Sequence, residues 1–92
     1  MSKQMVADLQ PNQTVSSFFA VSQRSLVPFK NKSGSYLDLL LSDRSGSVIG
    51  RAWDGAEQIA EICQPGSVVK LEGRVDEYRG KLQVIIEDVA PA

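Results

Sequence analysis

The sequence predicts an all-β barrel of five strands, with one short helix between the third and fourth strands. Three observations lead to this prediction. Apolar and polar residues alternate along several stretches, which is the period-2 pattern of strands with one buried face. Short polar turns join such stretches in pairs, as in β-hairpins. Only residues 54–63 carry instead the apolar spacing of a helix.

The length and composition fit one small globular domain. The chain has 92 residues, of which 42% are hydrophobic and 23% charged, so a single core is expected. We expect a lead-in over residues 1–13, a barrel over residues 14–89 and the start of a linker over residues 90–92. No apolar run approaches the roughly 20 residues of a membrane span, and no signal-peptide core begins the chain. A cytoplasmic location without a membrane partner is therefore expected.

The net charge of −1 argues against a protein that coats nucleic acid by bulk electrostatics. Charge is nevertheless sorted along the chain, because residues 24–51 hold five basic side chains against two acidic ones, and residues 54–61 hold only acidic ones. The basic residues are Arg24, Lys30, Lys32, Arg44 and Arg51. Either a basic face lies opposite an acidic one, or the surface is a solvated mixture of both signs.

The first strand is expected over residues 14–27, which are rich in β-branched and aromatic side chains. Phe18 and Phe19 are adjacent, so their side chains point to opposite faces. A long, bent strand shared by two sheets would bury both rings, and this is the interpretation we favour.

A loop is expected over residues 27–35, because Pro28 interrupts strand pairing and small polar residues follow it. The loop is basic through Lys30 and Lys32. Phe29 lies between Pro28 and these lysines, and it has two possible positions. Either its ring is exposed and contacts nucleic acid, or it folds back as a plug for the core.

A hairpin over residues 36–53 is expected to have one buried and one open face. The buried face takes Leu37, Leu39, Leu41, Val48, Gly50 and Ala52, and the open face takes Tyr36, Asp38, Arg51 and Trp53. Two aromatic rings and an arginine on one open face can stack on bases and hold phosphate. The alternatives are that Trp53 packs against the start of the helix and that Tyr36 packs at a strand end with its hydroxyl in water.

The helix is expected to begin after Asp54, a good N-cap residue, with Glu57 three positions later completing a capping box. An apolar stripe of Ala56, Ile59, Ala60 and Cys63 follows. The Pro-Gly pair at residues 65–66 ends the helix. A helix this short is not stable alone, so we expect it to cover one end of the barrel.

The last two strands are expected over residues 67–78 and 82–89, joined by the turn Tyr78-Arg79-Gly80-Lys81. In the first of them Val69, Leu71 and Val75 face inward, and Arg74 faces outward. Gly73 belongs to the inward set, where a missing side chain permits a sharp bend. The alternative for Tyr78 is the same strand-end packing as for Tyr36.

Five strands with a helix between the third and fourth are the plan of the OB-fold, a Greek-key barrel. Its ligand face is formed by strands 2 and 3 and flanked by the loop after strand 1 and the strand 4–5 turn. Here both flanks are basic and carry an aromatic residue. The predicted nucleic-acid-binding residues are Phe29, Lys30, Lys32, Tyr36, Arg51, Trp53, Arg74, Tyr78, Arg79 and Lys81.

Three stretches carry a family resemblance: FFAVSQRSL, YLDLLLSDRSGSVIGRAWD and PGSVVKLEGRVDEYRGKLQV. Together they resemble the N-terminal OB domain of YhaM-type 3′–5′ exoribonucleases. In that family the OB domain precedes a metal-dependent HD phosphohydrolase domain. The resemblance implies a substrate-binding domain of a larger nuclease, with catalysis downstream of this sequence.

The pattern is also similar to simple single-stranded-DNA-binding OB proteins. In those proteins a tryptophan that ends strand 3 and an aromatic residue before the strand 4–5 turn stack on bases. The resemblance assigns these roles to Trp53 and Tyr78. Some of these proteins carry a further aromatic residue at the position of Arg74, which here could hold phosphate or stack through its guanidinium plane.

No catalytic centre, metal site or cofactor is expected in this chain. Histidine is absent, and Cys63, the only cysteine, is expected to be a small core residue. Asp38 and Asp43 could pair on a metal, but Asp43 is better explained as an Asx-turn residue. We expect the chain itself not to be an enzyme. We expect it to bind single-stranded nucleic acid, either RNA or DNA. The alternative is an interaction or oligomerisation module that binds a protein partner through the same face.

Overall fold

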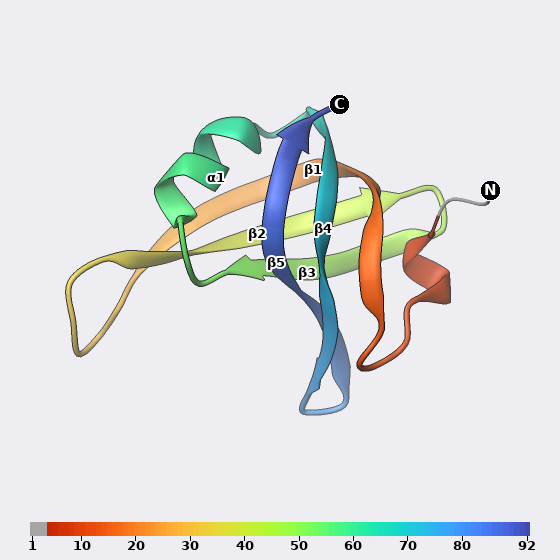
Figure 1. Cartoon of the computed structure of the whole chain (residues 1–92), viewed down its shortest axis with the longest axis horizontal. Coiled ribbons are helices and arrows are strands. Elements are labelled where there is room, and N and C mark those ends of the chain that lie inside the picture. The colour runs from red at the N-terminus through yellow and green to blue at the C-terminus, as the bar shows by residue number, and fades with distance from the viewer. Residues whose placement is uncertain (1–3) are drawn as a thin grey trace.

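The computed structural model describes residues 4–92. Its strands close into a barrel in the order β1-β2-β3-β5-β4, so the predicted fold class is confirmed (Figure 1). The elements are η1 (Val6–Asp8, a 3-10 helix), β1 (Thr14–Pro28), β2 (Ser35–Asp43), β3 (Gly46–Ala52), α1 (Ala56–Ile62), β4 (Val68–Tyr78) and β5 (Lys81–Pro91). Residues 1–3 of the expected lead-in lie outside the described residues.

Strand β1 is long and shared, as predicted, because residues 14–20 pair with β4 and residues 20–28 pair with β2. The prediction that both phenylalanines are buried is wrong. Phe19 is 1% exposed, but Phe18 is 42% exposed and lies opposite Lys70 on the outer surface. The strand changes partners only at Ala20, so at Phe18 it still has one inner and one outer face.

Strands β2 and β3 form a hairpin whose turn consists of Arg44 and Ser45. The Asp43 carboxylate accepts hydrogen bonds from the Ser45 N–H at 2.8 Å and from the Val6 N–H at 2.9 Å. The predicted Asx-turn role of Asp43 is therefore confirmed, and the same side chain also holds η1 against the barrel. The inward residues are buried as predicted, the leucines at 0–1% exposure.

Helix α1 packs against the barrel through its predicted stripe, in which Ala56, Ala60 and Cys63 are buried (Figure 1). The predicted capping box is wrong. The N-cap is Gly55 in the left-handed region, at φ 64°, and no side-chain hydrogen bond caps the N-terminus of the helix. At the other end the Arg24 guanidinium of β1 donates a hydrogen bond to the Ala60 carbonyl at 2.7 Å. This bond satisfies a carbonyl of the last turn.

Strands β4 and β5 carry a bulge opposite Gly73, the position at which the sequence predicts a bend. A Cβ atom at Gly73 would lie 2.2 Å from the Ile85 carbonyl oxygen, so only glycine fits. Strand β5 continues through Pro91. Residues 90 and 91, where the start of a linker is expected, therefore belong to the strand. No helix in residues 4–92 is long and apolar enough to cross a membrane.

Candidate nucleic-acid interface

The outer face of β2 and β3 is organised by an ion pair that the sequence analysis missed. Asp38 and Arg51 lie opposite each other in the antiparallel register, and Arg51 Nε is 3.1 Å from Asp38 Oδ1. Both side chains are partly exposed. The Arg51 guanidinium carbon also lies 5.9 Å from the centroid of the Tyr36 ring. Asp38 and the Tyr36 ring therefore both contact Arg51 on this face, and the Asp38 carboxylate offsets part of its charge.

Three aromatic rings gather at one end of this face. The Tyr36 and Trp53 ring centroids are 4.6 Å apart, and the Phe29 ring lies 6.4 Å from Trp53 with nearly parallel planes, 15° apart. We call Phe29, Tyr36 and Trp53 the aromatic cluster. Trp53 is 43% exposed and lies outside the buried core. Phe29 folds back onto the outer face, where it packs on rings rather than plugging the core.

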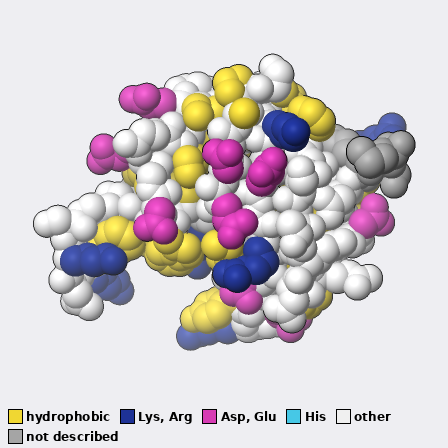
Figure 2. Space-filling view, in the orientation of Figure 1, with side chains coloured by type: hydrophobic (Ala, Val, Ile, Leu, Met, Phe, Trp, Pro, Cys, Tyr) yellow, Lys and Arg dark blue, Asp and Glu magenta, His cyan; other side chains and the backbone are white. Residues whose placement is uncertain are grey.

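The loop that carries Phe29 also supplies the lysines. Lys32 Nζ lies 4.5 Å from the centroid of the Phe29 ring, a cation–π contact, and Lys30 is exposed. Figure 2 shows basic side chains beside apolar ones at the left of the molecule, where the loop between β1 and β2 lies in Figure 1. A second basic and apolar group lies at the bottom of the same view.

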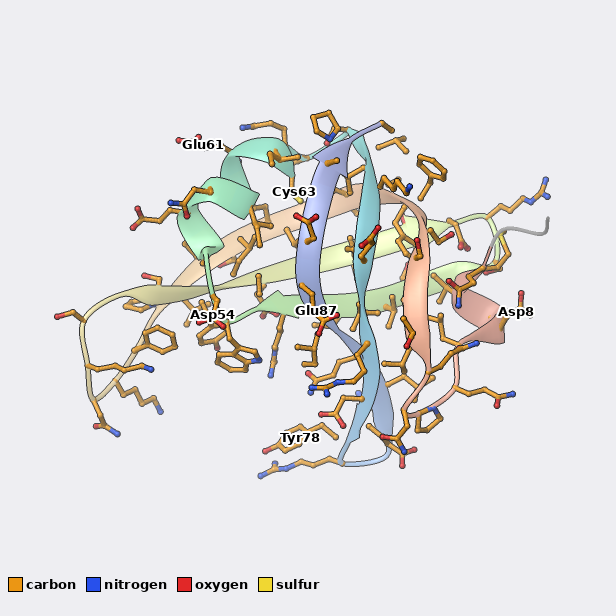
Figure 3. The ribbon with its side chains drawn as sticks, viewed as in Figure 1. Asp8, Asp54, Glu61, Cys63, Tyr78 and Glu87 are labelled. Carbon is orange, nitrogen blue, oxygen red and sulfur yellow. The ribbon has the colours of Figure 1, made fainter. Side chains whose placement is uncertain are left out.

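That second group is the tip of the β4–β5 hairpin, where Tyr78 is 55% exposed (Figure 3). The Arg79 guanidinium carbon lies 5.2 Å from the Tyr78 ring centroid. Arg79 and Gly80 both have positive φ, at 53° and 78°, as a tight two-residue hairpin turn requires. A shallow hollow of about 120 Å³ contains Arg51, Tyr78 and Lys81 in its lining, so the hairpin tip adjoins the β3 face.

A row of outward residues connects the two ends of the face. Arg51 on β3 lies opposite Ile85 on β5, and Ile85 lies opposite Arg74 on β4. Ile85 therefore sits between two arginines. Beside this row is a hollow of about 320 Å³, the Trp53 hollow, lined by Trp53, Asp54, Arg74, Ile85, Ile86 and Glu87.

The structure thus brings the predicted residues onto one continuous surface with two basic ends. The aromatic cluster and loop lysines form one end, Tyr78, Arg79 and Lys81 form the other, and Arg51 and Arg74 lie between them. Sequence reasoning missed Asp38 as the partner of Arg51, and it also missed Ile85, Asp54 and Glu87. The Asp38–Arg51 register could have been found by counting back from the hairpin turn.

Within residues 4–92, no three His, Cys, Asp or Glu side chains are grouped as metal ligands. Burial raises the pKa of the Cys63 thiol from 9.0 to about 11, a shift that the positive charge of Arg24 partly opposes. Cys63 is thus a protonated thiol at neutral pH, inside the core.

Comparison with known proteins identifies the family of this chain. The profile of the OB-fold nucleic acid binding domain matches residues 20–92. The 3′-5′ exoribonuclease YhaM of Bacillus licheniformis is 33% identical over 57 residues, which are 62% of this chain and 18% of the relative. The YhaM protein of Halalkalibacterium halodurans is 26% identical over 82 residues, which are 89% of this chain and 25% of the relative.

A solved structure shows the same fold. The second OB-fold domain of replication protein A from Methanococcus maripaludis superposes with a TM-score of 0.72 at 18% identity, covering 98% of this chain and 94% of that domain. The chain spans a quarter or less of the two exoribonucleases described above. The profile match covers most of the sequence, and the barrel has the expected topology. The chain therefore belongs to the family of OB-fold nucleic acid binding domains.

Proposed function

We propose that this chain binds single-stranded nucleic acid along the surface from the aromatic cluster to the β4–β5 hairpin tip. The observation that carries the proposal is the grouping of partly exposed rings with cations at both ends of one face. Aromatic rings stack on bases only when those bases are free of a complementary strand. The cations hold the phosphates between successive bases.

The same features set the expected strength of binding. Stacking contributes roughly 1–3 kcal/mol per base. A domain whose net charge is −1 adds little long-range electrostatic attraction for a nucleic acid. A dissociation constant on the order of micromolar follows for a short strand.

We further propose that the chain serves as the substrate-binding domain of a larger 3′–5′ exoribonuclease. The support is the similarity to YhaM proteins, of which it matches only a small part. The domain would hold RNA for an HD-type phosphohydrolase domain, which would carry the metal-dependent hydrolysis. Single-stranded RNA is then the natural ligand, and single-stranded DNA would bind through the same stacking.

Fluorescence anisotropy tests the binding proposal directly. Labelled oligo-U and oligo-dT of about 12 nucleotides, within the span of one or two OB sites, are compared with a duplex of the same length at low salt. We expect both single strands to bind several-fold more tightly than the duplex. Equal binding of the duplex, or no binding of any oligonucleotide, would contradict the proposal and favour a protein partner on this face.

A further inference from the structure

The Trp53 hollow has a composition that phosphate binding does not explain. Strands β3 and β5 are parallel, and Arg51 lies opposite Ile85. Trp53 and Glu87 each follow these residues by two positions, so they continue on the same outer face, and both line the hollow. A carboxylate thus lies beside the exposed ring that the binding proposal uses for stacking.

The β4–β5 bulge leaves a second exposed carboxylate next to Glu87. Asp88 lies opposite Glu72 and Ile86 lies opposite Gly73, which leaves Glu87 as the extra residue on β5. Ile86 and Val89 on either side are buried, whereas Glu87 and Asp88 are both exposed. Without the bulge, strict alternation would turn one of these two carboxylates toward the core. The side-chain-free position at Gly73 permits this geometry.

Two carboxylates line the hollow, and within residues 4–92 neither forms an ion pair or a hydrogen bond. Figure 3 shows Asp54 where the chain leaves β3 and Glu87 on β5. Within residues 4–92 the one ion pair joins Arg51 and Asp38, and no hydrogen bond to Asp54 or Glu87 is formed by a described side chain. Carboxylates repel phosphate and accept hydrogen bonds. The ligand group that fits here is therefore a base edge that donates N–H groups.

We propose that the Trp53 hollow binds a guanine base of the single strand, an inference that rests on the binding function proposed above. Trp53 stacks on the base, and the Glu87 carboxylate accepts hydrogen bonds from guanine N1–H and N2–H. Arg74, on the other side of Ile85, donates to the guanine O6 or N7 acceptors, the pairing that arginine makes with this base elsewhere. The hollow of about 320 Å³ is large enough for one base.

Guanine fits this donor and acceptor set better than the other bases do. It presents two neighbouring N–H donors to one carboxylate, with acceptors on the adjoining edge. Adenine and cytosine present one amino group each, and uracil presents a single ring N–H. A bidentate pair discriminates between bases by roughly 5- to 150-fold. We therefore expect guanine to be preferred over uracil by about tenfold.

The test uses the full chain and RNA of about eight nucleotides. Oligo-U carrying one central guanosine is compared with oligo-U carrying inosine, which lacks the N2 amino group, and with oligo-U alone. Guanosine should bind about tenfold more tightly than uridine, with inosine between them. Glu87→Gln should abolish most of this preference, because an amide offers one acceptor oxygen and no charge.

Asp88→Asn is the matched control. It removes the same charge from the neighbouring exposed position, where Asp88 Oδ1 accepts a hydrogen bond from the Val89 N–H at 3.0 Å and does not line the hollow. This variant should keep the guanosine preference. A preference that survives the combined Glu87→Gln and Asp54→Asn variant would overturn the inference.

Two outcomes for the wild-type chain separate this inference from the binding proposal. If guanosine, inosine and uridine strands bind equally, base reading at the Trp53 hollow is refuted while single-strand binding stands. If no strand binds at low salt, the binding proposal itself fails and this inference fails with it.

Discussion

Replacing both loop lysines should weaken the salt dependence of single-strand binding. Five cations on the proposed surface make no ion pair within the described residues, because the one ion pair there holds Arg51. These cations are Lys30, Lys32, Arg74, Arg79 and Lys81. Each phosphate contact contributes about −0.7 to the slope of log K against log salt for a single strand. If all five cations contact phosphate, the slope is about −3.5.

The two substitutions Lys30→Ala and Lys32→Ala should reduce this slope to about −2.1. Between about 50 and 200 mM salt, affinity should then fall about 18-fold, compared with about 130-fold for the wild-type chain. Asp38→Asn should act in the opposite direction. It releases Arg51 from the 3.1 Å ion pair, and one further phosphate contact steepens the slope to about −4.2.

The assay is fluorescence anisotropy with oligo-U at several salt concentrations. The control carries Arg44→Ala and Lys70→Ala, which remove the same charge from the β2–β3 turn and from the part of β4 opposite Phe18. Its slope should match that of the wild-type chain. The reasoning is refuted if the Lys30 and Lys32 variant loses affinity equally at every salt concentration, or if the control changes the slope as much.

Three further predictions concern the barrel that supports the surface. The pKa of the Cys63 thiol rises from 9.0 to about 11 on folding, so with increasing pH the thiol ionises in the unfolded chain before it ionises in the folded one. The contribution of Cys63 to the free energy of unfolding is therefore complete below pH 9 and is lost as the pH rises toward 11. Urea unfolding should show a shallower decline in Cys63→Ala, and an identical decline would contradict this. Gly73→Ala should destabilise by more than about 3 kcal/mol, since its Cβ meets the Ile85 carbonyl at 2.2 Å; an unchanged melting temperature would refute it. Arg79→Asn should raise the free energy of unfolding by up to about 1 kcal/mol, because asparagine tolerates the φ of 53° better than arginine does. The same substitution should weaken oligo-U binding, because it removes a cation from the proposed surface.

The strands were predictable because their pattern is local. Leu71 lies between the polar residues Lys70 and Glu72 and is buried at 0% exposure. The helix stripe was predictable for the same reason. The cap was not, because Asp54 matches the N-cap preference, yet Gly55 takes the cap position in a left-handed conformation that joins α1 to β3. Phe18 was misplaced because the point where β1 changes partners depends on pairing between distant segments.

The surface was predictable in its aromatic residues but not in its electrostatics. Tyr36 and Trp53 share a face through the hairpin register alone. The place of Glu87 near Trp53 depends on the pairing of β3 with β5. The exposure of Asp88 depends on the bulge opposite Gly73, which forms only when β4 and β5 pair. The glycine signals a bend but not its effect on the next strand. The charge beside Trp53 therefore could be identified only in the folded structure.

The most direct test of the account is the fluorescence of Trp53, the sole tryptophan, during titration with oligo-U. We predict quenching by the single strand and not by a duplex. Trp53→Ala should cost about 1–3 kcal/mol of binding and leave the salt slope unchanged, because stacking carries no charge. Because Trp53 is 43% exposed and lies outside the core, its replacement should leave the fold intact, which thermal unfolding of the variant checks. Unquenched emission, together with a folded Trp53→Ala variant that binds as tightly as the wild-type chain, would contradict the proposed surface.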